Sequence, residues 1–144
     1  MFLYGGEHVA RTPVDSDQAA WSLSLEDLQW RKLPDGPPPR VAHTQAVFND
    51  TTVFVFGGRA GITMSEQPMN DLWKFDTENE TWEEVIVDGD KPSPRSFHKM
   101  VCVGSSLFVF GGCSAEGRLA DLHRYDIEGN TWHPLDPSPL LRGR

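Results

Sequence analysis

Three arginines could together bind an anion, because each lies in the loop that follows a different pair of adjacent glycines. These are Arg11, Arg59 and Arg118, on a chain whose formal net charge is −8. A planar guanidinium forms bidentate hydrogen bonds to sulfate, phosphate or carboxylate. Phe97 could hold an apolar part of the same ligand, and Glu7 lies in the first of the loops. We predict a ligand site from these five residues; the alternative is that the arginines are solvated or paired with acidic residues of the loops.

Other kinds of chemistry have little support in the sequence. There is no block of Lys and Arg, so a nucleic-acid or anionic membrane surface is not expected. Cys102 and Cys113 have neither metal-site spacing nor a disulfide framework. The nucleophile and phosphate-loop motifs of common hydrolases are missing. We therefore assign no catalytic and no metal-binding residue.

The expected location is the reducing cytoplasm. No apolar run approaches the roughly 20 residues that span a bilayer. The first residues, from Met1 to Gly6, carry neither a basic segment nor a long apolar stretch of the kind found in signal peptides.

A repeat of about 50 residues organises the whole chain. Double glycines, tryptophans, Asp-Leu pairs and Pro-Arg pairs each recur with this period. They are Gly5-Gly6, Gly57-Gly58 and Gly111-Gly112; Trp30, Trp82 and Trp132; Asp71-Leu72 and Asp121-Leu122; Pro39-Arg40 and Pro94-Arg95. Because these residues recur once per unit, we assign them to structure, and the same holds for His43 and His98.

Each unit contains four short β segments separated by Gly, Pro, Asn and Asp. In the middle unit they are residues 43–48, 52–58, 71–76 and 81–87. The glycines would let strands of neighbouring units approach closely, and the tryptophan would fill the space between units. The aspartates, before Leu or after the aromatic residue, would cap turns.

A period near 50 with four strands per unit resembles the kelch repeat, which implies an all-β propeller of four-stranded antiparallel blades. Residues 1–33 give a partial blade, 40–88 and 95–136 give two more, and 137–144 lead into another. Three blades do not close a ring, since propellers have typically four to eight. We expect a fragment of a propeller, with the remaining blades as a partner. By itself it would be an open arc whose apolar end faces make it marginally stable or self-associating. The loops after the double glycines should share one end of the arc.

Several segments also resemble the specifier proteins of glucosinolate breakdown, a group of nitrile-specifier, epithiospecifier and thiocyanate-forming proteins. The matching segments are Gly5-Gly6-Glu7 with residues 13–15, and residues 56–59, 94–100 and 117–122. The resemblance implies an iron(II) protein that steers a thiohydroximate-O-sulfate toward a nitrile. By position, Arg59 and Arg118 would hold the sulfate, stabilising the charge of the leaving group, and Phe97 would line the pocket.

The iron ligands of that group do not appear in this chain. Their pattern is Glu-x-x-x-Asp-x-x-x-His, but Glu66 is followed four residues later by Asn70, and Glu7 by Arg11. We therefore expect no cofactor in this chain, with Fe(II) implied only for a complete specifier-like protein, and no catalysis by the chain alone.

Three functions remain open. The chain could supply the anion-binding part of a specifier-like lyase, with a small sulfated ligand. It could be a protein-interaction module whose loops grip a partner, a frequent use of kelch propellers, although a fold does not determine function. It could also be a small-molecule sensor or an inactive relative.

Overall fold

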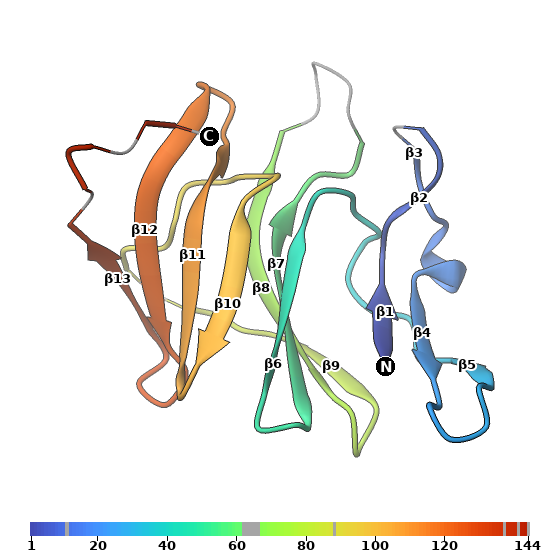
Figure 1. Ribbon diagram of the computed structural model, residues 1–144. Coiled ribbons are helices and arrows are strands. Elements are labelled where there is room, and N and C mark those ends of the chain that lie inside the picture. Colours follow the sequence, from blue (N-terminus) through green and yellow to red (C-terminus); the bar gives the residue numbers. More distant parts are fainter. Residues whose placement is uncertain (11, 62–66, 88, 137, 141, 144) are drawn as a thin grey trace.

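In the part of the chain that the structure describes, three antiparallel β-sheets of three or four strands stand side by side in an open arc (Figure 1). The computed structural model describes residues 1–144 except 11, 62–66, 88, 137, 141 and 144. Each sheet is built from one sequence repeat, and we call the sheets blades 1, 2 and 3 in chain order. This confirms the predicted all-β class and the four-stranded antiparallel blades.

Blades 2 and 3 have the same strand order, with neighbours in sequence paired in space. Blade 2 contains β6 (Thr44–Phe48), β7 (Thr52–Gly58), β8 (Met69–Asp76) and β9 (Thr81–Glu84). Blade 3 contains β10 (Lys99–Val103), β11 (Ser106–Cys113), β12 (Arg118–Asp126) and β13 (Thr131–Leu135). The strands β6 and β10 lie next to each other, on the inner side of the arc.

Blade 1 is a three-stranded sheet of β1 (Phe2–Tyr4), β4 (Ala20–Leu23) and β5 (Trp30–Lys32). A small hairpin, β2 (Glu7–Val9) and β3 (Thr12–Pro13), and one turn of 3-10 helix (Ser16–Gln18) separate β1 from β4. The sequence did not predict this hairpin. It also placed the outer strand of blade 2 at 81–87, whereas β9 ends at Glu84.

The strand β7 is buried on both faces because blade 2 lies between blades 1 and 3, whereas β11 of the end blade 3 alternates between buried and partly buried residues. In β7, Val53 and Val55 pack toward blade 1, while Phe54 and Phe56 pack toward blade 3. A continuous apolar run of β-branched and aromatic residues suits such a position. The core is therefore two layers, one between each pair of blades.

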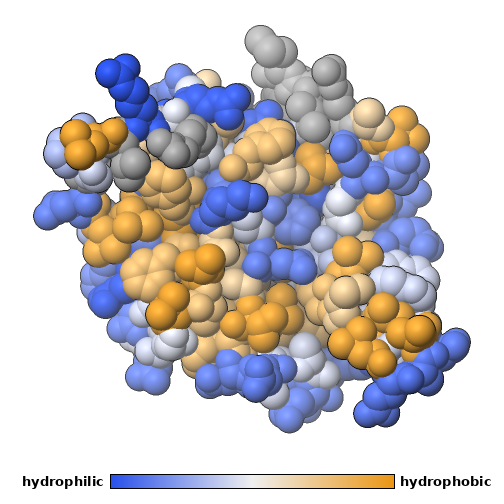
Figure 2. All heavy atoms as spheres, in the orientation of Figure 1, coloured by the Kyte–Doolittle hydropathy of each residue, from blue (hydrophilic) through white to orange (hydrophobic). Residues whose placement is uncertain are grey.

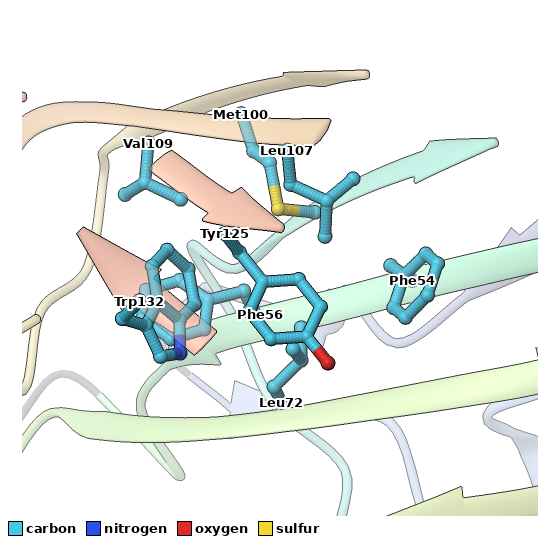
Figure 3. Packing of buried hydrophobic residues seen from close by; sticks show 8 residues of the cluster. All are labelled: Phe54, Phe56, Leu72, Met100, Leu107, Val109, Tyr125 and Trp132. Carbon is cyan, nitrogen blue, oxygen red and sulfur yellow. The ribbon is translucent and has the colours of Figure 1, made fainter. Parts of the chain in front are cut away.

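The layer between blades 2 and 3 is shown in Figure 3. It consists of Phe54, Phe56, Leu72, Met100, Leu107, Val109, Tyr125 and Trp132. Trp132 lies with its ring centroid 5.3 Å from that of Phe56 in the neighbouring blade. Trp82 likewise packs against Tyr4 of blade 1, at 5.0 Å. Trp82 and Trp132 thus fill the space between blades, as predicted, whereas Trp30 of the end blade is exposed.

Apolar side chains are exposed on both end blades. Figure 2 shows apolar side chains gathered on the left of the view, the side on which Figure 1 places β11 to β13. Val101 and Val103 of β10 are 55% and 62% exposed, and Trp30 of blade 1, the counterpart of Trp82, is 51% exposed. Marginal stability or self-association of the arc stays a prediction.

The prediction that Asp71 and Asp121 cap turns is wrong. Each of these aspartates instead pairs with a buried arginine. Arg40 donates two hydrogen bonds to the carboxylate of Asp71, at 2.7 and 2.9 Å. Arg95 does the same to Asp121, with both bonds at 2.8 Å. Both arginines are fully buried. Each also donates to a carbonyl of a double glycine, Gly57 or Gly111, so the pair holds the second strand of its blade.

The aspartate after the aromatic residue behaves as predicted in blade 2. Asp76 Oδ1 accepts hydrogen bonds from the backbone N–H groups of Glu78 and Asn79, at 2.8 and 3.1 Å. The side-chain amide of Asn79 also donates to Asp76 Oδ2, at 2.7 Å. This side-chain bond, followed by the two backbone bonds, lowers the pKa of the Asp76 carboxyl, and together they hold the turn between β8 and β9.

Gly57, the first glycine of the middle pair, should be intolerant of any side chain because its backbone is left-handed and because it lies against the neighbouring blade. Gly57 and Gly104 have nearly the same left-handed φ, 61° and 57°. A Cβ on Gly57 would lie 2.8 Å from the carbonyl oxygen of Arg95 in blade 3, whereas Gly104 has nothing within 4 Å.

We expect Gly104→Ala to cost about 1 kcal/mol for the left-handed backbone. Gly57→Ala should cost roughly 1–3 kcal/mol more because the blades must separate. Urea unfolding of both variants measures the difference. Equal losses would mean that the close approach of the blades is unimportant.

Candidate functional site

The loops after the double glycines and the segments that enter the inner strands meet at one end of the arc, the upper end in Figure 1. We call this end the rim. It follows from the strand directions, since the second and fourth strands of an antiparallel blade finish at the same end. The described parts of the three loops therefore share one end of the arc, as predicted.

Backbone hydrogen bonds connect the rim across blades 2 and 3. Val41 and Arg59 bond to each other through both N–H groups, at 2.9 and 3.0 Å. The next residue, Ala42, accepts a bond of 2.9 Å from the N–H of Phe97 in blade 3. Ser96 then pairs with Cys113 in the same way as Val41 pairs with Arg59. This network gives the rim a fixed backbone on which side chains can vary.

Phe97 is the most unusual side chain of the rim. It is 53% exposed, although its backbone lies between two blades. Its φ is 58°, and the matching residue of blade 2, Ala42, has 55°. The left-handed backbone therefore belongs to the repeat, while the aromatic side chain does not. A large aromatic held outward on a fixed backbone loses little conformational entropy on binding.

Arg59 and Arg118 both lie on the rim, as predicted. Arg59 follows β7, and Arg118 begins β12 opposite Cys113. Neither forms an ion pair with another residue in the described part of the chain, and the Nε of Arg59 is buried there without a hydrogen-bond partner. Pairing with acidic loop residues, the alternative reading of these two arginines, is therefore not observed within that part.

The other two predicted site residues belong to blade 1. Glu7 begins β2 and is exposed, with Pro13 as its partner across the hairpin. Arg11 lies outside the described residues. The structure thus places Glu7 on the rim beside blade 1, and Arg59, Phe97 and Arg118 on the rim of blades 2 and 3.

A cavity of about 410 Å³ opens at the rim between blades 2 and 3, and the sequence did not predict it. Its walls come from three separate segments and are mostly apolar. They are Gln67, Pro68, Ser93, Pro94, Ser114, Ala115, Glu116 and Leu119. The only sequence signal was the variable loop after Gly112, which contributes three of these residues.

Beneath the rim, His43 and His98 are structural. Burial, together with the charge of the adjacent Arg95, lowers the pKa of His98 to about 4. Burial and Arg40 do the same for His43. The His98 Nε2 lies 2.6 Å from the hydroxyl of Thr44 in blade 2. Among the described residues no group of three or more His, Cys, Asp or Glu is placed to hold a metal.

The described segments also contain no helix long and apolar enough to cross a membrane.

Comparison with known proteins gives a consistent picture. Residues 1–140 match the family model described as the KLHDC2/KLHL20/DRC7 Kelch-repeats domain. Adagio protein 3 of Arabidopsis thaliana is 34% identical over 96% of the chain, which corresponds to 23% of that protein. Adagio-like protein 3 of rice is 36% identical over 96% of the chain and 22% of the relative.

Human leucine-zipper-like transcriptional regulator 1 is 30% identical over 82% of the chain, but this is 15% of that protein. The chain therefore spans less than a quarter of the length of these relatives. Specifier proteins are not among the relatives described, so the resemblance read from the loops is not demonstrated.

Proposed function

Because the chain belongs to the kelch-repeat family, we propose that it is a protein-interaction module that binds a partner protein at its rim. The observation that carries the proposal is the exposed Phe97 on a backbone fixed by hydrogen bonds between two blades. Aromatic residues and arginines dominate the binding energy of protein interfaces. Arg59 and Arg118 lie on the same rim, and the rim cavity between blades 2 and 3, which neither arginine lines, could receive a side chain of the partner.

The specifier-like reading is a second candidate for the same surface. It is favoured by the two rim arginines that have no ion-pair partner in the described part of the chain. In this reading Arg59 and Arg118 bind a sulfate, Phe97 contacts the apolar part of the ligand, and Fe(II) is supplied by a part of a complete protein outside this chain. The comparisons favour the interaction module over this reading.

Replacing Phe97 tests the proposal. We expect peptides selected by display on the immobilised protein to bind Phe97→Ala at least about ten-fold more weakly, because truncating an aromatic anchor costs around 2 kcal/mol. Val103→Ala, also an exposed apolar residue but at the other end of β10, should bind them unchanged. Isothermal titration calorimetry measures both affinities.

If both variants bind equally well, the rim is not the interaction surface. If sulfate displaces the peptides where chloride of equal ionic strength does not, the rim is an anion site.

A further inference from the structure

Two matching grooves run between the blades at the end opposite the rim. One, of about 340 Å³, lies between blades 1 and 2, and the other, of about 490 Å³, lies between blades 2 and 3. We call them groove 1–2 and groove 2–3. Their walls use the same positions of the repeat: Phe2, Leu33 and Phe75 in the first, and Phe54, Val85 and Tyr125 in the second. Groove 1–2 therefore serves as an internal reference for groove 2–3.

An ion pair crosses groove 1–2. Arg31 of blade 1 pairs with Glu80, which lies in the turn before β9 of blade 2, and both residues line the groove. The two blades are joined at this point by charges of opposite sign, so the mouth of the groove is partly covered.

Among the described residues, no ion pair crosses groove 2–3. The position of Arg31 is taken by Glu83, and that of Glu80 by Asn130. Glu83 pairs within its own blade with Lys74, at 3.1 Å, and its side chain is 66% exposed. Asn130 accepts a bond of 2.6 Å from the Tyr125 hydroxyl and donates one of 3.2 Å to the Ile86 carbonyl. The described residues therefore place no arginine opposite a glutamate across groove 2–3, and the volume of this groove exceeds that of groove 1–2.

The remaining walls of groove 2–3 define what it could hold. Its apolar surface includes Ile127 and Ile86, and Ile86 is 70% exposed. Its charged wall has two carboxylates, Glu83 and Glu84, against one ammonium, Lys74. An occupant must therefore offer an aliphatic surface and a positive charge.

We propose that groove 2–3 binds a segment of a partner protein in which an aliphatic side chain is adjacent to an arginine or lysine. The aliphatic group packs on Ile86 and Ile127, and the cation pairs with Glu83. The cation of the partner thus supplies to groove 2–3 the charge that Arg31 supplies to groove 1–2. This surface is separate from the rim, and either can fail without the other.

Titration with two short peptides tests the proposal. The probes are Gly-Leu-Arg-Leu-Gly and Gly-Leu-Glu-Leu-Gly with blocked ends, and the readout is the shift of backbone amide signals in NMR spectra. We expect the Arg peptide to shift Ile86, Ile127 and Asn130, and the Glu peptide to shift them much less. Glu83→Gln should weaken the Arg peptide roughly three-fold, the effect of one exposed ion pair. Glu78→Gln, with the same loss of charge in a nearby turn, should not.

A double variant closes the groove from within. Glu83→Arg with Asn130→Glu copies the pair of groove 1–2, and Glu is compatible with the backbone because Glu80 and Asn130 have similar φ values, 55° and 50°. We expect roughly ten-fold weaker binding of the Arg peptide. The proposal is overturned if the Glu peptide binds equally well, if Glu83→Gln has no effect, or if the shifts lie at Phe97 instead. The last outcome would support the rim alone.

Discussion

Replacing Arg95 with methionine is expected to lower the free energy of unfolding by about 3 kcal/mol. The guanidinium is fully buried and makes two hydrogen bonds to Asp121. Removing one partner of a buried ion pair costs 3–5 kcal/mol because a charge is left without compensation. The lower end of this range applies because 37% of the Asp121 side chain is exposed and water can reach it.

Urea unfolding of matched variants measures this effect. Arg31→Met removes an exposed arginine that also pairs with a carboxylate, and it should leave stability unchanged within error. The double variant Arg95→Met/Asp121→Leu should recover part of the loss, because it leaves neither charge unpaired. If Arg95→Met and Arg31→Met have the same stability, the buried pair does not hold the blade together.

The fold was predictable because the same packing contacts between neighbouring blades must form once per blade. A glycine that approaches a neighbouring backbone, or a tryptophan that fills a gap between blades, must recur wherever the gap recurs. The sequence did not show which recurring charges meet. Arg40 and Asp71 are 31 residues apart, and each is plausible alone as a turn residue. Their pairing depends on how the segment before β6 folds back onto β8.

The candidate site was predictable only where it departs from the repeat. Phe97 differs from its counterpart Ala42, and that difference marked it before its exposure was known. The cavity at the rim was not predictable, because residues such as Pro68, Pro94 and Leu119 come from segments brought together by two blades. The groove between blades 2 and 3 escaped notice for another reason. Glu83 alone gives no sign of a binding site. It becomes informative only by comparison with Arg31, the residue at the same position of blade 1.

Mild acid should unfold the protein, because two histidines are buried without charge. His43 and His98 have pKa values of about 4 in the folded chain, against 6.5 for a free side chain. The unfolded chain therefore binds protons first as the pH falls. The stability that each histidine confers is complete above pH 6.5 and is lost as the pH drops from 6.5 toward 4. The loss is about 3 kcal/mol for each at pH 4, and a domain has only 5–15 kcal/mol in total.

Urea unfolding at pH 7, 6, 5 and 4 measures the loss, which should approach 6 kcal/mol for the pair at pH 4. His98→Gln should be less stable at pH 7 but show about half the pH dependence, because one of the two protons is no longer taken up. His133→Gln, an exposed histidine of β13, should keep the full dependence. Burial raises the pKa of Asp121, but hydrogen bonds from Arg95 and His123 outweigh it and lower that pKa to about 2. The stability that this carboxylate confers is present above about pH 4 and is lost only at lower pH, so it does not obscure the result. Stability that stays constant between pH 7 and 5 would mean that the two imidazoles accept protons without opening the blades.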